Sequence, residues 1–281
     1  TDVGSYMLTV TGKGNYTGKI ENVNWKIEPM QLYRFCDIEP VTKVYDGTAV
    51  APIAKSALAF HDANARGASV TLPEDAYDIT NARFTMRQSD GTYADSPEAG
   101  DGKSLSFTVT LKSGNYVFKG GTADVMDCDY TTDKVDMFTI SKATAPRSDF
   151  HPAVTVINDL AKTYEMLLTD SYLPKLSSPC GYGNVSYSLR GTYLTDGYKD
   201  TVQVKVMEEN GQYKLKLTVP AVDYNKVSSV GTIDVRVTSD NYRDFYLTIG
   251  VKTKNKDVPV PDGTISASDI TYGQALNDSK I

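Results

Sequence analysis

The sequence predicts an all-β protein made of tandem Ig-like β-sandwich domains, and three observations support this prediction. β-branched residues are abundant, with 30 Thr, 26 Val and 12 Ile among 281 residues, and such residues favour strands over helices. Apolar and polar residues alternate along most of the chain, which is the period of a half-buried strand. A strand–turn–strand pattern also recurs. The alternative is a β-grasp-like unit in which the Ala-rich residues 50–66 form a helix.

The clearest single element is a hairpin over residues 201–220. Asn210-Gly211 separates two alternating runs, and this dipeptide favours a type I′ turn because both central residues need a positive φ. The turn and the hydrophobic pattern then predict the same register, with the apolar pairs on one face. These pairs are Val206 with Leu215, Val204 with Leu217, and Val202 with Val219.

The recurring pattern is an alternating strand that ends in Val-Thr, a short loop with Asn-Tyr, and a second alternating strand. Gly and Asn suit the left-handed backbone of tight loops, so each copy predicts the closing hairpin of a β domain. The copies are Tyr6–Thr11 with Asn15-Tyr16 and Val23–Ile27, Leu105–Thr110 with Asn115-Tyr116 and Phe138–Ile140, and Ile233–Thr238 with Asn241-Tyr242 and Leu247–Val251.

A second motif marks the start of each unit. It occurs as Lys43-Val44-Tyr45-Asp46-Gly47-Thr48, as Lys162-Thr163-Tyr164 and as Ile270-Thr271-Tyr272-Gly273. The spacing exceeds the roughly 20–50 residues of solenoid repeats and suits separate domains in tandem. We therefore expect the closing strands of a truncated unit at 1–30, complete units at 31–145 and 146–256, and the opening of a further truncated unit at 257–281.

These motifs carry a family resemblance. Val44-Tyr45-Asp46-Gly47-Thr48, the run Glu98–Lys103 and Gly114-Asn115-Tyr116 resemble the YDG-type repeat, Ile270–Gln274 resembles the start of the related MBG (YGX-type) repeat, and Thr9–Gly18 resembles its end. The unit 146–256 matches less well, because it lacks Asp-Gly after Tyr164. The resemblance implies a large secreted or wall-attached bacterial protein, often of a Gram-positive organism, with stalk-like or adhesive roles and no catalytic residues.

Composition argues against several functional classes. Lys and Arg total 29 and Asp and Glu total 35, for a net charge of −6, so we expect neither nucleic acid nor an anionic membrane surface as a partner. Apolar runs fall far short of the roughly 20 residues of a membrane-spanning helix. The 2 His lie outside any recognisable nucleophile motif, so we expect no enzyme, no catalytic residues and no cofactor.

Calcium is the metal that the sequence favours. Asp127, Asp129, Asp133 and Asp136 cluster between two predicted strands of 31–145, and Ca²⁺ takes six to eight oxygen ligands from such loops. Their spacing is not that of an EF-hand loop. A solvated acidic loop is the alternative interpretation.

Tyrosine supplies the candidate ligand-binding residues. Tyr182, Tyr187, Tyr193 and Tyr198 lie among glycines in 146–256, and Tyr on Gly-rich loops suits contact with a glycan or a host surface protein. The alternative is that alternating tyrosines cover one face of a sandwich.

Two covalent links stay open at this stage. Cys36 and Cys128 fall in one predicted unit, so a disulfide is compatible with the fold, whereas two buried thiols are the simpler interpretation. Lys43 with Asn115, and Lys162 with Asn241, suit the positions of an intramolecular isopeptide bond, although the Asn residues also suit turns.

Taken together, these features predict a non-catalytic stalk or spacer with weak adhesion, extracellular and either wall-attached or secreted. The alternative is a carbohydrate- or host-protein-binding module centred on 146–256. We expect a monomer in solution, with one open hypothesis: the unpaired strands of the truncated units pair between molecules.

Overall fold

β-strands form all the long elements in the described part of the chain. We describe a computed structural model, in which residues 2–120, 124–134, 136–147, 150–158, 160–221 and 229–255 are placed. Within these ranges the helices are short 3-10 turns, η1 (Lys55–Ala57), η2 (Glu74–Ala76) and η3 (Asp170–Tyr172). The predicted all-β class is therefore confirmed. The predicted unit at 257–281, with its Ile270–Gln274 motif, lies outside the described residues.

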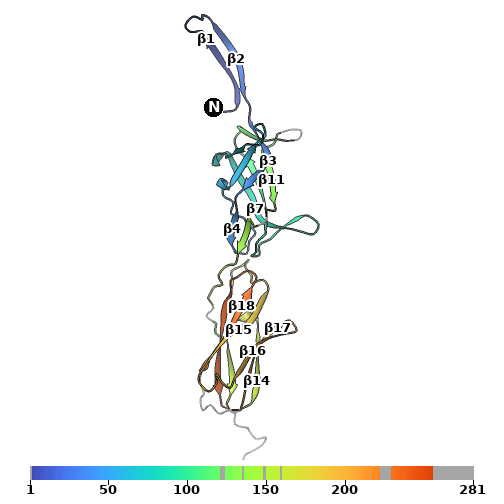
Figure 1. Cartoon of the computed structure of the whole chain (residues 1–281), viewed down its shortest axis with the longest axis vertical. Coiled ribbons are helices and arrows are strands. Elements are labelled where there is room, and N and C mark those ends of the chain that lie inside the picture. Colours follow the sequence, from blue (N-terminus) through green and yellow to red (C-terminus); the bar gives the residue numbers. More distant parts are fainter. Residues whose placement is uncertain are drawn as a thin grey trace, which may run out of the picture. The chain divides into compact units, whose positions relative to one another are not determined.

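Contacts between residues divide the chain into two units, and Figure 1 labels several strands of each. Unit 1 comprises Thr1–Asp149, Pro174–Ser186 and Val237–Phe245, and unit 2 comprises Phe150–Leu173, Tyr187–Arg236 and Tyr246–Ile281. The division after Asp149 falls close to the boundary that the sequence predicts at 145/146. Two segments that we assigned to 146–256 instead belong to unit 1, because they pack against its residues.

Unit 1 contains a separate hairpin and three further sheets, in the orders β1-β2, β10-β3-β5-β6, β11-β9-β7-β8 and β12-β4. Its strands are β1 (Gly4–Thr11), β2 (Lys19–Ile27), β3 (Met30–Ile38), β4 (Val41–Val44), β5 (Leu58–Asp62), β6 (Ser69–Val70), β7 (Tyr77–Arg87), β8 (Tyr93–Asp95), β9 (Ser104–Leu111), β10 (Tyr116–Phe118), β11 (Asp127–Thr132) and β12 (Phe138–Ser141). The two four-stranded sheets and β12-β4 share one core, in which Phe60, Phe84 and Phe138 are each 0% exposed.

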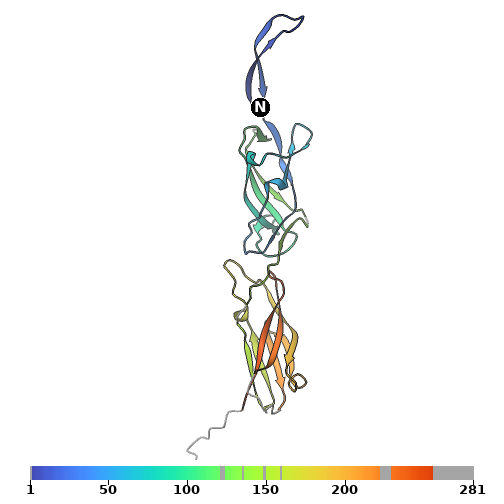
Figure 2. The ribbon, with the colours of Figure 1, turned by 90° about the vertical axis from the view of Figure 1, so that its left-hand side faces the viewer.

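Unit 2 has two sheets, in the orders β13-β19-β18-β15 and β14-β17-β16 (Figure 2). Its strands are β13 (Ala153–Ile157), β14 (Lys162–Leu168), β15 (Val185–Leu194), β16 (Gln203–Glu209), β17 (Gln212–Val219), β18 (Ser229–Ser239) and β19 (Phe245–Lys254). Each sheet buries one face, as a sandwich requires. Leu217 of the smaller sheet and Ile233 and Ile249 of the larger one are each 0% exposed.

In each predicted complete unit the last strand pairs in parallel with an early strand, which is the second strand in 31–145 and the first in 146–256. In 31–145, β4 pairs with β12 from Val41 beside Phe138 to Val44 beside Ser141. In 146–256, β13 pairs with β19 from Ala153 beside Gly250 to Ile157 beside Lys254. Because these strands run in the same direction, the chain enters one end of the paired strands and leaves at the other.

The hairpin predicted over 201–220 is confirmed. Asn210 and Gly211 have φ of 52° and 74°, as a type I′ turn requires. Val206 lies beside Leu215 and Val204 beside Leu217. The third predicted pair does not form, because β16 begins at Gln203 and leaves Val202 outside the ladder.

Residues 50–66 form no α-helix, so the β-grasp alternative is wrong. They hold η1 and then β5, which pairs antiparallel with β3. Leu58 and Phe60 are 2% and 0% exposed, while Ala59 between them is half-buried. That period of two belongs to a strand, and the pairing with β3 outweighs the helix preference of alanine.

The second copy of the recurring pattern is not a hairpin, contrary to the prediction. β9 pairs antiparallel with β7 and β11. After Asn115-Tyr116 the chain forms β10, which pairs in parallel with β3 instead of returning along β9. Turn chemistry alone therefore did not fix the partner of the following strand.

Removal of side-chain volume at Leu217 tests the sandwich core of unit 2. We expect Leu217→Ala to lower the free energy of unfolding by about 2–5 kcal/mol, because its side chain is fully buried. Leu189→Ala in β15 is the matched control, since Leu189 is 38% exposed, and we expect a change within about 0.5 kcal/mol. Urea unfolding measures both, and equal losses would contradict the assigned core.

Candidate functional site

The predicted ligand-binding tyrosines do not share one surface. Tyr182 belongs to unit 1 and the other three belong to unit 2. Tyr187 and Tyr198 are 7% and 2% exposed, so they pack in a core and offer no ring face to a ligand. Tyr193 is 57% exposed. We grouped the four residues because they are close in the sequence, but that spacing does not show which side chains point into the core.

Tyr182 packs within unit 1. Its hydroxyl donates to the Pro174 carbonyl oxygen at 2.8 Å. Its ring centre lies 5.1 Å from that of Tyr242 and 5.7 Å from that of Phe245. These contacts hold the 174–186 segment in place.

The predicted calcium ligands make other contacts or face solvent. Asp129 accepts a hydrogen bond from Thr108 at 2.7 Å, Asp133 accepts from Ser104 at 2.5 Å and from the Tyr93 hydroxyl, and Asp127 and Asp136 are exposed. Across the described part of the chain, no three His, Cys, Asp or Glu side chains are placed to hold a metal ion. The calcium site therefore stays a prediction from the sequence.

The side chains proposed for isopeptide bonds have other partners. Lys43 Nζ donates to Asp46 at 2.8 Å and to the Thr48 carbonyl oxygen at 2.7 Å. Asn115 bonds to Asp2 and to the Val3 amide. Lys162 lies over the Tyr164 ring, with Nζ 5.5 Å from its centre. Neither predicted Lys–Asn pair is thus brought together by these contacts.

The cysteines are free thiols. Cys128 is buried, and Cys36 and Cys180 are half-buried. Burial, with a smaller contribution from Cys128, raises the pKa of Cys36 to about 12. The Cys36 thiol is therefore protonated at neutral pH and is a poor nucleophile.

The Asn-Tyr motif joins the repeat to the chain that precedes it. The Ala143 amide donates to the Asn241 carbonyl oxygen at 3.0 Å, and Arg243 donates to the Ala143 carbonyl oxygen at 2.8 Å. The Asn241 side chain accepts from the Ala99 amide at 2.9 Å and donates to the Gly181 carbonyl oxygen at 3.0 Å. All these residues belong to unit 1.

The preceding copy of the motif makes the same junction. The Met30 amide donates to the Asn115 carbonyl oxygen at 2.9 Å, and Tyr116 lies beside Met30 in a parallel pair, as Tyr242 lies beside Ala143. Asn115 accepts from the Val3 amide at 2.8 Å. Sequence analysis treated these asparagines only as turn formers, so it missed that they bind the incoming chain.

The Tyr-Asp-Gly motif holds the 174–186 segment against the rest of unit 1. Tyr45 is 8% exposed, and its hydroxyl donates to the Gly181 carbonyl oxygen at 3.1 Å and accepts from the Gly181 amide at 3.0 Å. Gly47 has φ of +78°, and a Cβ there would lie 2.9 Å from the Cys180 amide nitrogen. Both the backbone angle and the lack of space explain glycine at this position.

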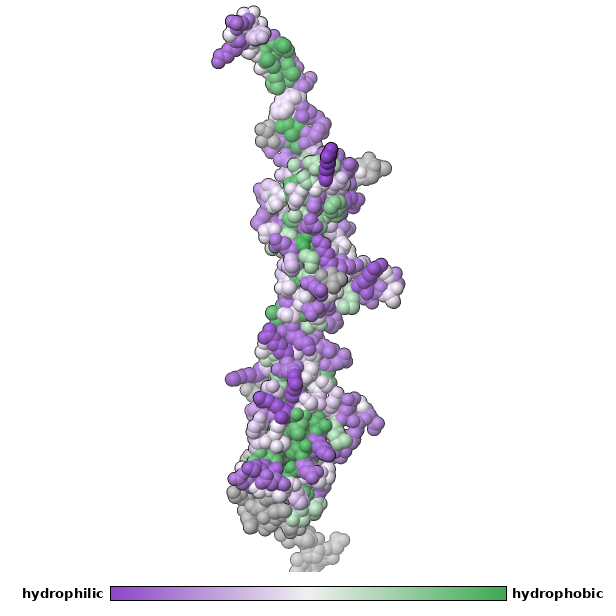
Figure 3. Space-filling view, in the orientation of Figure 1, coloured by the Kyte–Doolittle hydropathy of each residue, from purple (hydrophilic) through white to green (hydrophobic). Residues whose placement is uncertain are grey.

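The hairpin β1-β2 carries an apolar face. Tyr6 lies beside Trp25, Leu8 beside Val23 and Val10 beside Ile20, so side chains of one kind share a face. Leu8, Val10, Ile20 and Trp25 are 38%, 49%, 64% and 44% exposed. Figure 3 shows hydrophobic surface gathered on this hairpin.

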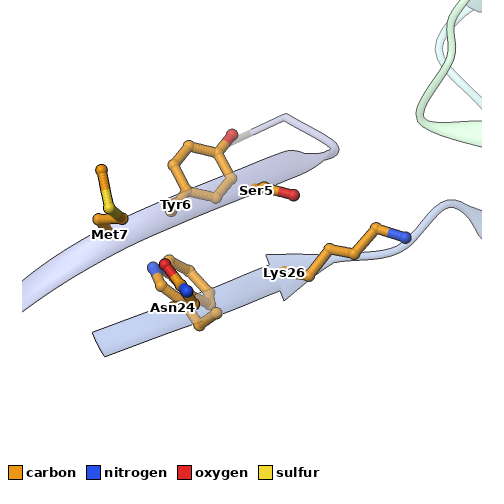
Figure 4. A pocket seen from close by; sticks show the side chains of 6 residues that line it. Ser5, Tyr6, Met7, Asn24 and Lys26 are labelled. Carbon is orange, nitrogen blue, oxygen red and sulfur yellow. The ribbon is translucent and has the colours of Figure 1, made fainter. Parts of the chain in front are cut away.

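An open pocket lies where the rings of Tyr6 and Trp25 meet (Figure 4). The ring centres are 5.2 Å apart, with the planes tilted by 36°. Ser5, Met7, Asn24 and Lys26 complete the lining. We call the apolar face of β1-β2 the hairpin face. It is suited to packing against another apolar strand or sheet, because its exposed side chains Leu8, Val10, Ile20 and Trp25 are aliphatic or aromatic.

Hydrogen bonds keep a subset of the acidic side chains ionised. Hydrogen bonds from Ser104 and Tyr93 lower the pKa of Asp133, and those from Lys216 and Lys214 lower the pKa of Glu209. Among the described residues, every Asp or Glu with a resolved pKa shift is shifted downward. A general acid needs the opposite shift at neutral pH.

No family model matches this chain, and no curated protein matches it. Among solved structures, the protocadherin gammaB7 EC3-6 cis-dimer is 16% identical over 89% of this chain and 58% of its own length, with a TM-score of 0.30. The human desmocollin-1 ectodomain is 11% identical over 83% of this chain and 41% of its own length, with a TM-score of 0.29. Zebrafish RET cadherin-like domains 1 to 4 are 11% identical over 89% and 58%, with a TM-score of 0.27. The chain thus spans about half of each of these structures, and similarity at this level carries no argument about its function.

Tyr45→Phe tests whether the motif tyrosine holds the 174–186 segment. The change removes one hydroxyl that makes both a donated and an accepted bond to Gly181. We expect a loss of about 1–3 kcal/mol in the unfolding free energy of unit 1, because the Gly181 amide loses its partner. Tyr6→Phe is the control, since its hydroxyl bonds to Asp2 in an exposed site. Urea unfolding at neutral pH compares them, and an unchanged Tyr45→Phe variant would refute the role.

Proposed function

We propose that this chain is a non-catalytic, extracellular tandem-repeat segment of a bacterial cell-surface protein, either wall-attached or secreted. Its work is mechanical: it acts as a stalk or spacer that carries tension and contributes weak adhesion. The motif resemblance to YDG and MBG repeats supports the bacterial and extracellular parts of this proposal. Within the described residues no helix is long and apolar enough to cross a membrane.

The parallel pairing of an early strand with the last strand of each predicted unit is the observation that carries the proposal. In 146–256 the partners β13 and β19 are the first and last described strands. A pull on the two ends of such a domain acts along the paired strands, so their hydrogen bonds bear the load together instead of opening one by one. In 31–145 the last strand, β12, pairs with β4, the strand after β3, and parallel closing pairs in two successive repeats suit a load-bearing stalk.

The repeated junction at the Asn-Tyr motif supports the same function. Met30 bonds to Asn115, and Ala143 bonds to Asn241, through equivalent main-chain atoms. A chain that is hydrogen-bonded where it enters a repeat is less free to swivel there than a flexible linker. The motif residues thus form hydrogen bonds at the connection between repeats, and we assign none of them a catalytic role.

Lys252→Pro tests the load path. The Gly250 amide donates to the Pro152 carbonyl oxygen at 2.8 Å, and the Asn158 amide donates to the Lys254 carbonyl oxygen at 2.9 Å. In a parallel pair every second residue of a strand bonds to the neighbouring strand. Lys252 lies midway between Gly250 and Lys254, so its amide points to β13. Proline removes this donor. We expect single-molecule pulling through the chain ends to show a lower unfolding force for unit 2.

Lys205→Pro in β16 is the matched control. β16 is an edge strand of the other sheet and joins neither end of the repeat. We expect this variant to lose equilibrium stability but to keep most of its unfolding force, because forced unfolding follows the barrier along the pulling direction. Equal falls in force for both variants would count against the stalk proposal.

A binding module remains the second candidate, supported by one feature of unit 2. Phe150 and Tyr172 stack with their planes 3° apart and their ring centres 5.8 Å apart. Phe150 is 54% exposed. Parallel rings, with Phe150 exposed and Tyr172 half-buried, suit the flat face of a sugar or a partner's aromatic side chain.

Tyr172→Ala tests this second candidate on a glycan array. If the stacked pair binds a glycan, the variant loses the dose-dependent signal that the unmodified chain gives. Tyr246→Ala is the control, because Tyr246 is 48% exposed but lies under Arg190, outside this pair. A signal that survives Tyr172→Ala would place binding elsewhere, and silence from the unmodified chain would reject the module.

A further inference from the structure

A pocket opens at one edge of the sandwich in unit 1, between β3 and β11. These two strands contact each other and are labelled in Figure 1. β10 pairs with β3 only over Met30–Leu32, and β11 is the edge strand of the other four-stranded sheet. The pocket has a volume of about 280 Å³, which is at the small end of ligand sites, since these run from about 300 to 1,000 Å³.

The inner wall of the pocket is apolar. Phe107 of β9 and Tyr130 of β11 stack there, with their ring centres 5.1 Å apart and their planes tilted by 15°. Cys36 and Ile38 line it from β3, and they share one face of that strand because alternate residues point the same way. The flat stacked rings and the aliphatic side chain suit the apolar body of a small organic molecule.

The Tyr130 hydroxyl is a buried polar group without a hydrogen-bond partner among the described residues. Tyr130 is 8% exposed, and buried hydroxyls in folded proteins are normally satisfied. Burial raises the pKa of Tyr130, and the nearby thiols of Cys36 and Cys128 raise it further. The hydroxyl therefore keeps its proton and is available as a donor beside the pocket.

Arg34 brings a positive charge to the same pocket. The Cys128 thiol donates to the Arg34 carbonyl oxygen, with sulfur and oxygen 3.7 Å apart, and its sulfur also raises the pKa of the Arg34 guanidinium. In the described ranges this guanidinium forms no ion pair. Asp129 borders the pocket as well, but it follows the buried Cys128 in the strand and faces the other way, where Thr108 donates to it at 2.7 Å.

We propose that this pocket binds a small monocarboxylate with an apolar body. The Arg34 guanidinium and the Tyr130 hydroxyl are both donors, so the ligand has to supply acceptors. The planar fork of a guanidinium matches a carboxylate, and the pair forms strong charge-assisted hydrogen bonds. The apolar body then lies against Phe107 and Ile38. The inference goes beyond the stalk function, because it uses none of the residues that join the repeats.

Ligand-observed NMR on the full chain tests the site with benzoate, phenylacetate and hexanoate, each beside its neutral amide. We expect saturable binding of at least one carboxylate at neutral pH. Its amide, which has nearly the same shape but no charge, should bind about tenfold or more weakly. Inorganic phosphate should not displace the carboxylate, because it has no apolar body to cover the stacked rings.

Two variants separate ligand recognition from folding. Arg34→Met keeps the length of the side chain and removes its charge, so the affinity should fall about tenfold or more. Arg83→Met is the matched control, because Arg83 is an exposed arginine of the same unit outside the lining, and it should bind like the unmodified chain. Tyr130→Phe removes only the unpartnered hydroxyl, so the affinity should fall about threefold to tenfold while stability to urea stays the same or rises.

Four results would overturn the proposal. Either no carboxylate binds, or a carboxylate and its amide bind equally, or the affinity survives Arg34→Met. Displacement of the carboxylate by phosphate at equal concentration would show that the site recognises any oxyanion, which contradicts the assigned ligand class.

Discussion

Parallel pairing between an early strand and the last strand of a repeat is the constraint on which the rest of this structure depends. It closes β4 against β12 and β13 against β19, and it places the entry and exit of the chain at opposite ends of the paired strands. Strands that are neighbours in the sheet but about 100 residues apart in sequence must find each other late, because closing a long loop has a large entropic cost. Once formed, this pair joins the beginning and the end of the repeat through hydrogen bonds that share a load.

The short motifs acquire a physical meaning in this frame. Tyr45 and Gly47 shape a turn against which the 174–186 segment packs, and Asn241 bonds to both that segment and the Ala99 amide. These residues shape turns and form hydrogen bonds to the main chain. They do not converge on a cavity, and the acidic groups near them are hydrogen-bonded acceptors. A connector explains this distribution better than an active site does.

Local features could be predicted from the sequence, and non-local ones could not. The register of the 203–219 hairpin follows from Asn210-Gly211 and the alternation around it, because both are properties of neighbouring residues. The turn before β10 carries the same Asn-Tyr pattern as the other copies, yet β10 pairs in parallel with β3. Residues 114–118 contain no feature that predicts this partner. The prediction that Tyr182, Tyr187, Tyr193 and Tyr198 share one binding surface was wrong for a related reason. Tyr187 and Tyr198 are buried by partners distant in sequence, and the spacing of tyrosines carries no record of those partners.

The same limit applies to the hairpin face. Its alternating residues predicted two strands, and the structure confirms β1 and β2, with Tyr6 beside Trp25. The exposure of that face appeared only in the structure.

Native-state hydrogen exchange on the full chain tests the central claim most directly. If the parallel pair with the last strand closes each repeat, the amides of β4, β12, β13 and β19 that bond across it exchange only through global unfolding and form the slowest class in their repeats. Their exchange free energies then equal the unfolding free energy from urea. Fast, denaturant-independent exchange of these amides, with slower exchange elsewhere in the same repeat, would show that the paired ends fray and would contradict the account.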